Sequence, residues 1–411
     1  MRRLAVFLLL ASLVGLAWTD EESRAKIPIT GEADPKFARF DELLTTFLDK
    51  YNYPGGVSLA VGKDGQQLYT RGYGYADRET KQPVKTDSLF RLSSLSKPIT
   101  AVAILQLVEK GRLNLDDRIL TVLGLVPPTR GFDERWRKIT IRHLLEHRAG
   151  WDPKKSDDPM FLSPVIVKEL GGTHPAMPAT IIRYMLRQPL DFEPGSKFVY
   201  CNFGYCLLGR VIEKVSRQTY EAYVKKNIIA PLGLKSMRQG RTLYSLRAPN
   251  EVRYHSSRRV PAVLGASLGR QIPAPYGGFC IEAMDSHAGW LATASDILRF
   301  LHAFEDPEKC PLLKPKTIER MFARPEGEDP KSESYYALGW SVQPFPGGKR
   351  AFWHDGSLEG SSSMIMHRPD EISFAILLNS SETIDKKPPI AVLTVPMQLA
   401  CNYVFLMPPK K

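Results

Sequence analysis

The stretch from Leu92 to Gly111, LSSLSKPITAVAILQLVEKG, predicts a helix that is apolar on nearly every side. Its apolar residues leave no polar stripe: Ile99, Val102, Ile104, Leu105 and Val108. A helix of this kind is stable only inside a protein, so the fold has to surround this segment with other elements. Lys97 lies in the first turn, and we therefore expect its amino group to be partly withdrawn from water.

Strand patterns occur near both ends of the chain. DPKFARFDELLTTFLDKY (34–51) predicts a helix capped by Asp34, and a hairpin follows around the turn Lys63-Asp64-Gly65. Four more strands are predicted toward the C-terminus: ALGWSV (Ala337 to Val342), KRAFWHDG (Lys349 to Gly356), SSMIMHRP (Ser362 to Pro369) and EISFAILLN (Glu371 to Asn379). A final helix is predicted around Pro396 to Leu406.

The middle of the chain is mostly helical in pattern. The simplest assembly is an α/β fold of the α+β type, in which both chain ends build one antiparallel sheet flanked by helices and an all-helical domain is inserted. We expect the sheet domain to comprise residues 34–110 and 240–407, and the helical domain residues 111–239. Sites usually form in the cleft between such domains.

Residues 1–19 have the pattern of a secretory signal peptide: two arginines, an apolar stretch from Leu4 to about Leu16, then small residues. The apolar stretch is short for a membrane span, and polar residues follow it directly. We therefore expect a periplasmic or extracellular protein without a stable membrane anchor.

The formal net charge is +12, and the densest basic stretch, Arg238 to Arg259, contains one acid, Glu251. This stretch is either a solvated loop or a surface attracted to anionic cell-wall or membrane material. It lacks the interleaved aromatic residues of a nucleic-acid binder, so no nucleic-acid partner is expected. Five cysteines cannot all pair within one chain, and neither a disulfide pattern nor an oligomeric state is predicted.

Three serines precede Lys97, but only Ser94 stands three residues before it and shares its helical face. Burial can lower a lysine pKa by up to about 3–5 units. Lys97 would then be a usable base toward the Ser94 hydroxyl. The alternative is that a serine merely caps the helix, and a second Ser-x-x-Lys occurs in SRAK, residues 23–26.

Two further motifs carry candidate site residues. Tyr200-Cys201-Asn202 stands where a helix begins; the tyrosine could relay protons and the asparagine could hold a substrate amide, or the motif is an ordinary helix start. His354-Asp355-Gly356 ends a predicted strand, where a small residue lets substrate backbone lie alongside. The same pattern recurs once, in His287-Ala288-Gly289.

In this order, and with these strands around them, the three motifs resemble the serine β-lactamase and penicillin-binding-protein superfamily. The likeness is to its class C β-lactamase-related branch of DD-carboxypeptidases, esterases and D-amino-acid peptidases, and it extends from about Phe37 to Leu406. Supporting stretches are LLEHRAGW (Leu144 to Trp151), PGSKFVYCNFGYCLLG (Pro194 to Gly209), PLGLKSM (Pro231 to Met237) and GWLATASDILRF (Gly289 to Phe300).

The resemblance implies an exported serine hydrolase with no metal and no cofactor. Ser94 would be the acylated nucleophile, Lys97 and Tyr200 would share the general base and acid work, and Asn202 would bind substrate. The backbone N–H groups of Ser94 and Ser357 would form the oxyanion hole.

The third motif is expected on the strand that faces the nucleophile, which favours His354, with Gly356, over His287. The class C β-lactamases carry lysine where this chain has His354. A largely neutral imidazole is a poorer anchor for an antibiotic carboxylate. Cys201 also stands where serine is frequent in the family.

Ester or D-amino-acid peptide substrates, small or derived from peptidoglycan, are therefore expected first, and β-lactam hydrolysis second. An alternative of another class is a slowly deacylating penicillin-binding receptor or an assembling structural protein.

Two rival motifs are weaker. GASLG (Gly265 to Gly269) fits a nucleophile elbow around Ser267, but prolines stand on both sides where a strand and a helix are required. HLLEH (His143 to His147) fits a zinc-binding helix but would need a distant third ligand.

Overall fold

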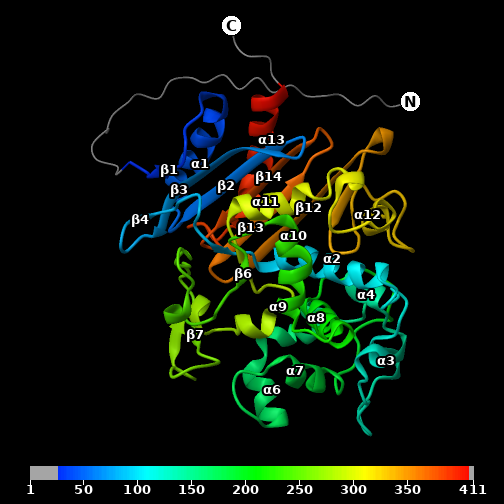
Figure 1. The fold of residues 1–411 in the computed structure, drawn as a ribbon. Coiled ribbons are helices and arrows are strands. Elements are labelled where there is room, and N and C mark those ends of the chain that lie inside the picture. Colours follow the sequence, from blue (N-terminus) through cyan, green and yellow to red (C-terminus); the bar gives the residue numbers. More distant parts are fainter. Residues whose placement is uncertain (1–25, 407–411) are drawn as a thin grey trace, which may run out of the picture.

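In the computed structural model, which describes residues 26–406, an antiparallel sheet joins the two ends of the chain (Figure 1). The strand order is β1-β3-β2-β14-β13-β12-β11-β10, and β4 pairs with β3. The strands from the N-terminal part are β1 (Ile29–Thr30), β2 (Gly56–Lys63), β3 (Gln66–Asp77) and β4 (Gln82–Pro83). Those from the C-terminal part are β10 (Tyr335–Tyr336), β11 (Ser341–Pro344), β12 (Arg350–Leu358), β13 (Ser361–His367) and β14 (Ile372–Leu378).

The two chain ends meet where β2 pairs with β14. Both strands are almost wholly buried, as expected for strands covered on both faces. The predicted fold class, a mixed helix and antiparallel-sheet fold, is confirmed. The predicted signal peptide, residues 1–19, lies outside the described residues.

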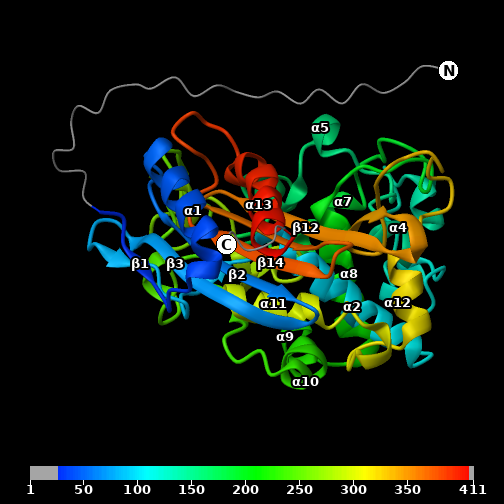
Figure 2. The same cartoon turned by 90° about the horizontal axis from the view of Figure 1, so that it is seen from above.

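Helices cover both faces of the sheet. Helices α1 (Ala38–Lys50) and α13 (Pro389–Leu406) lie side by side on one face (Figure 2). Their buried side chains, including Phe40, Leu44 and Met397, form one apolar core with β2, β13 and β14. On the other face, α11 (Ala294–His302) packs against β2, β3 and β14.

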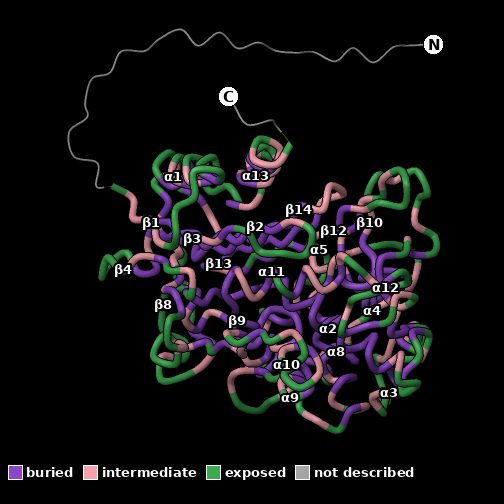
Figure 3. Tube along the Cα trace, turned by 45° about the horizontal axis from the view of Figure 1, so that its top comes forward, coloured by how far each residue is buried: buried purple, intermediate pink, exposed green. Residues whose placement is uncertain are grey.

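Helix α2 (Ser96–Glu109) runs below the sheet through the most buried part of the molecule (Figure 3). Every residue from Ser96 to Leu107 is buried, which confirms the prediction from its apolar sequence. Among the helices, α8 (Asn202–Ser216) makes the most extensive contact with α2. The fold thus sets the first turn of α2 between the sheet and the helices beneath it.

The remaining elements are short. The helices are α3 (Ile119–Leu123), α4 (Ile141–Leu145), α5 (Pro153–Ser156), α6 (Ser163–Leu170), α7 (Pro178–Met185), α9 (Tyr220–Val224), α10 (Ala230–Leu232) and α12 (Pro315–Phe322). A small sheet pairs β5 (Phe90–Arg91) and β6 (Arg238–Gln239) with β9 (Trp290–Ala292), and a hairpin joins β7 (Arg259–Pro261) to β8 (Gln271–Pro273). The domain boundaries near residues 110 and 240 stay a prediction.

Two predicted elements are wrong in extent. Ala337 to Trp340 is the bend of the β10–β11 hairpin rather than part of a strand, because Gly339 takes a left-handed φ of 89° and packs against α2. The last helix begins at Pro389, where a missing N–H costs nothing, and continues through Pro396. Packing of Leu393 and Met397 on the sheet holds the helix through that proline. Among residues 26–406, α13 alone has the length and apolar composition of a membrane-crossing helix.

The packing of α1 on the sheet yields a stability prediction. Leu44 is fully buried between α1 and the sheet, so Leu44→Ala should lower the free energy of unfolding by about 2 to 5 kcal/mol. Leu68→Ala removes the same atoms from a side chain that is 42% exposed and should cost less than about 1 kcal/mol. Urea unfolding of both variants checks this, and equal losses would contradict the placement of α1.

Candidate active site

Ser94 lies in a short 3₁₀ turn, Ser93–Leu95, that leads directly into α2. Ser93 adopts a left-handed φ of 51°, which is uncommon for a residue with a side chain. Its hydroxyl lies 2.9 Å from that of Ser361 on β13, and both side chains are buried. This contact ties the turn to the sheet and leaves the partly exposed Ser94 at the start of the helix.

Lys97 is fully buried one helical turn after Ser94, as its sequence position predicts. Its Nζ lies 3.0 Å from Ser94 Oγ, 2.7 Å from Asn202 Oδ1 and 3.3 Å from the carbonyl oxygen of His287. Burial lowers the pKa of Lys97 to about 7, against the opposing charges of Asp158 and Asp355. A large share of the amine is therefore neutral near pH 7 and able to accept a proton.

Tyr200 stands over Lys97, with the ring centroid 4.7 Å from Nζ. Burial raises the pKa of Tyr200 well above its usual range, and a hydrogen bond with Ser94 acts in the opposite direction. The phenol is therefore protonated near neutral pH. The ring of His147 packs against it at a centroid distance of 4.3 Å.

Asn202 begins α8 and links Lys97 to an acidic residue. While its Oδ1 accepts from Lys97, its Nδ2 donates to Asp158 Oδ2 at 2.7 Å. The backbone N–H of Met160 donates to the other oxygen, Asp158 Oδ1, at 3.0 Å. Asp158 thereby fixes which end of the Asn202 amide faces Lys97.

His354 lies on β12 beside this cluster and is only 3% exposed. Its Nδ1 lies 2.6 Å from the backbone carbonyl of Asp355, which can only accept, so Nδ1 carries the proton. Its Nε2, 3.0 Å away from the Tyr336 hydroxyl, therefore accepts from it. Burial and the charge of Lys97 lower the pKa of His354 to about 3, so the imidazole is neutral near pH 7.

Gly356 brings β12 against the turn that carries Ser94. A Cβ added to Gly356 would lie 2.5 Å from the Leu92 carbonyl oxygen and 3.0 Å from Ser94 N, so a larger residue does not fit. Strand β11 pairs with β12 only up to Trp353, whereas β13 pairs with it as far as Leu358. The segment from His354 to Leu358, which includes the exposed Ser357, therefore has one free edge.

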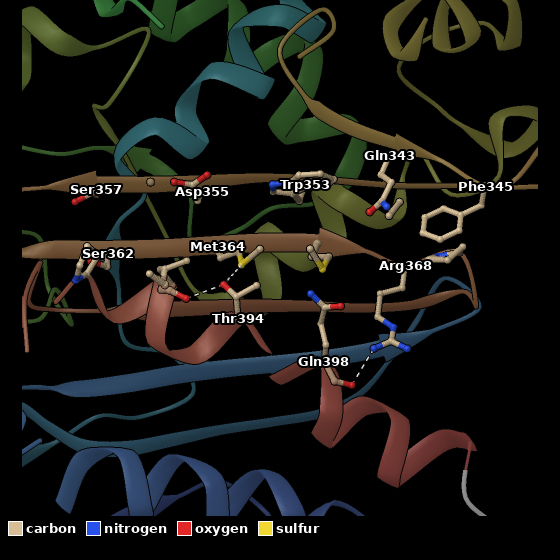
Figure 4. A pocket seen from close by; sticks show the side chains of 17 residues that line it. Gln343, Phe345, Trp353, Asp355, Ser357, Ser362, Met364, Arg368, Thr394 and Gln398 are labelled. Atoms are coloured by element: carbon tan, nitrogen blue, oxygen red, sulfur yellow. Dashed lines mark hydrogen bonds between the residues drawn. The ribbon is translucent and has the colours of Figure 1, made fainter. Parts of the chain in front are cut away.

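A groove of about 620 Å³ lies on the α13 side of β11, β12 and β13 (Figure 4). Asp355 and Ser357 line one end of it, and Phe345 and Arg368 line the other. Gly356 borders both this groove and the Ser94 turn, so β12 separates the end of the groove from Ser94.

The structure thus brings Ser94, Lys97, Tyr200, Asn202 and the His354–Ser357 segment into one place. The rival motifs form no such cluster. Ser267 lies in the turn between β7 and β8, with no helix after it. His147 follows the end of α4 with a left-handed φ of 55° and accepts from the Cys201 N–H, so it does not share a helix face with His143.

Sequence reasoning missed three neighbours of this cluster: Asp158, Tyr336 and the His287 carbonyl. Asp158 precedes a proline in a polar loop, and Tyr336 is one of sixteen tyrosines. Neither residue belongs to a sequence motif that would have pointed to the site. His287 was noticed only as a weak match to the third motif, whereas its backbone oxygen is the group that contacts Lys97.

Comparison with known proteins identifies the family. The model of the family described as Beta-lactamase matches residues 40–394. The chain belongs to the Beta-lactamase family. It is a serine hydrolase of that family, as the resemblance predicted.

Individual relatives agree with this assignment. The chain is 28% identical to penicillin-binding protein 4* of Bacillus subtilis, over 83% of this chain and 71% of that protein. It is 30% identical to esterase EstB of Burkholderia gladioli, over 65% of this chain and 69% of that protein. The fold is also that of the D-amino acid amidase from Ochrobactrum anthropi, with a TM-score of 0.69, 21% identity, and coverage of 90% and 99% of the two chains.

Gly356 provides a test of this site geometry. Gly356→Ala should reduce ester hydrolysis by at least about tenfold, because the new methyl group would push β12 away from Ser94. Gly204→Ala is the matched control, since its added Cβ would meet the nearest atom at 3.5 Å, an ordinary contact. Steady-state rates of both variants decide the point, and equal activities would mean that β12 does not border the nucleophile closely.

Proposed function

We propose that this serine hydrolase forms an acyl-enzyme on Ser94 and hydrolyses esters or amides. One observation carries the proposal: the buried Lys97 amine, with a pKa of about 7, lies 3.0 Å from the Ser94 hydroxyl. A neutral amine at that distance can take the serine proton as Oγ attacks a carbonyl carbon.

The neighbouring groups support the remaining steps. The backbone N–H groups of Ser94 and Ser357 stabilise the negative oxygen of the tetrahedral intermediate. Tyr200, a phenol whose pKa is raised by burial, protonates the leaving group and regains its proton from Lys97. Asn202 orients substrate and the lysine together. Water then attacks the acyl carbonyl while the amine of Lys97 again accepts a proton. As the bond between Ser94 Oγ and the acyl carbon breaks, Lys97 returns this proton to Oγ and the carboxylic acid product leaves.

Esters and amides of D-amino-acid type are the proposed substrates, and peptidoglycan fragments are one source of them. The similarity to esterase EstB and the fold shared with the D-amino acid amidase support this choice. β-Lactam hydrolysis ranks lower, because His354 is neutral and buried where class C β-lactamases carry lysine. Export to the periplasm or exterior rests on the pattern of residues 1–19.

The identity of the nucleophile can be mapped directly. A fluorophosphonate should label Ser94 alone, because no other serine in the motif lies within hydrogen-bond distance of Lys97 among the described residues. Peptide mapping by mass spectrometry locates the adduct, and Ser94→Ala should abolish it. Label on Ser93, Ser96 or Ser267 would overturn the assignment.

The base and the acid can be separated by substitution. Lys97→Arg keeps the positive charge but offers no neutral amine near pH 7, so acylation should fall by at least about a hundredfold. Tyr200→Phe should reduce the rate by a similar factor, and more strongly for amides than for activated esters, whose leaving groups need no proton. Single-turnover kinetics test both, and wild-type acylation in either variant would remove that residue from the mechanism.

A further inference from the structure

The charges around Ser94 differ in sign from those of the chain as a whole. The chain has a formal net charge of +12, yet the site is bordered by two carboxylates, Asp158 and Asp355. In the part of the chain that the structure describes, Lys97 is the one cation whose charge acts on either carboxylate.

Opposing effects act on the carboxyl group of Asp158: burial raises its pKa, whereas two hydrogen bonds and the charge of Lys97 favour the carboxylate. Its two oxygens each accept a hydrogen bond, one from Asn202 Nδ2 and one from the Met160 N–H. Hydrogen bonds donated to both oxygens stabilise the charged form of a carboxyl group. The charge therefore lies one amide group away from Lys97, on the α8 side of the nucleophile.

Asp355 stands on the other side, on the free edge of β12. It is exposed, and among residues 26–406 its carboxylate has no ion-pair partner. It lines the end of the groove that adjoins Gly356 and the Ser94 turn (Figure 4). Because side chains alternate along β12, Asp355 faces the α13 side, whereas Gly356 faces Ser94. The charge of Asp355 therefore acts on Lys97 and Tyr200 from across the strand. Desolvation raises the pKa of Asp355, and the charge of Lys97 lowers it.

The histidines of the site do not offset these charges. Burial lowers the pKa values of His147, His287 and His354, so all three imidazoles are neutral near pH 7. Burial raises the pKa of Tyr336 and of Cys201, so the phenol and the thiol stay uncharged. Lys97 acts as a base in its neutral form. In that form the charges that remain near Ser94 are the negative charges of Asp158 and Asp355.

We propose that Asp158 and Asp355 make this site selective against acyl donors that carry a carboxylate near the scissile bond, with cationic donors preferred over neutral isosteres. The inference rests on the proposed function and narrows it to neutral and cationic esters and amides. A substrate carboxylate entering the site would meet two like charges, and that of Asp158 lies in surroundings that screen it less than water does. The inference therefore removes donors that end in a free carboxylate from the proposed substrates, including penicillins and those peptidoglycan fragments that end in D-Ala-D-Ala.

Matched substrates test the selectivity. The first series comprises p-nitrophenyl esters of γ-trimethylammoniobutyric acid, of its neutral tert-butyl isostere and of glutaric acid. The second places the same three groups on the leaving side, as acetylthiocholine, its neutral carbon isostere and a carboxylate analogue. In at least one series, kcat/KM should be highest for the cationic substrate, lower for the neutral one and lowest for the anionic one. The cationic and anionic substrates should differ by at least about tenfold, and added salt should reduce this difference.

Three variants show which residue is responsible. Asp355→Asn, which alters an exposed side chain, and Asp158→Asn should each reduce the cation-to-anion ratio of kcat/KM by about tenfold, the effect of one partly screened charge pair. Asp157→Asn is the control, because it removes the same charge from an exposed neighbour of Asp158 and should leave the ratio unchanged.

The results separate the two proposals. The selectivity is overturned if the neutral esters are hydrolysed with no preference against the anionic ester. It is also overturned if neither Asp355→Asn nor Asp158→Asn changes the cation-to-anion ratio of kcat/KM. In both cases the proposed hydrolase function remains. A ratio lowered equally by Asp157→Asn overturns it too, because a general charge effect would then explain it. No hydrolysis of any neutral ester, with no label on Ser94, overturns the proposed function itself.

Discussion

The burial of one lysine amine is the constraint on which this site depends. Lys97 has no access to water, and its amino group lies within hydrogen-bond distance of Ser94, Asn202 and the His287 carbonyl, under the ring of Tyr200. Removing an ammonium group from water disfavours its charged form, which brings its pKa to about 7. An apolar helix in the centre of the fold thereby turns an ordinary lysine into a base.

The sheet positions the other half of the site. Pairing of β2 with β14 closes the sheet from the two chain ends, and β12 then lies against the turn that carries Ser94. Because β11 separates from β12 after Trp353, the following segment keeps a free edge, the kind of edge to which extended peptides add as a further strand. Gly356 allows the close approach, and the Ser93–Ser361 contact holds the turn to the same sheet.

Much of this arrangement was predictable from the sequence, because it depends on local patterns. The apolar segment after Lys97 required a central helix, the alternating strands required a sheet, and a spacing of three put Ser94 beside Lys97. Asp158 and Tyr336 were not predictable, since only the folded chain brings distant loops to the site. The start of the last helix was predicted wrongly at Pro396, because proline disfavours the interior of a helix. In the folded chain, packing on the sheet outweighs this preference.

The rate of Ser94 acylation as a function of pH tests the central claim most directly. Acylation requires the neutral amine, so the rate constant for a neutral ester, measured by rapid mixing from about pH 5 to pH 10, should rise with a single ionisation. We expect a midpoint near pH 7, the pKa of the buried Lys97 amine. A rate that is flat across this range, or that rises only near the ordinary lysine pKa of 10.5, would contradict it.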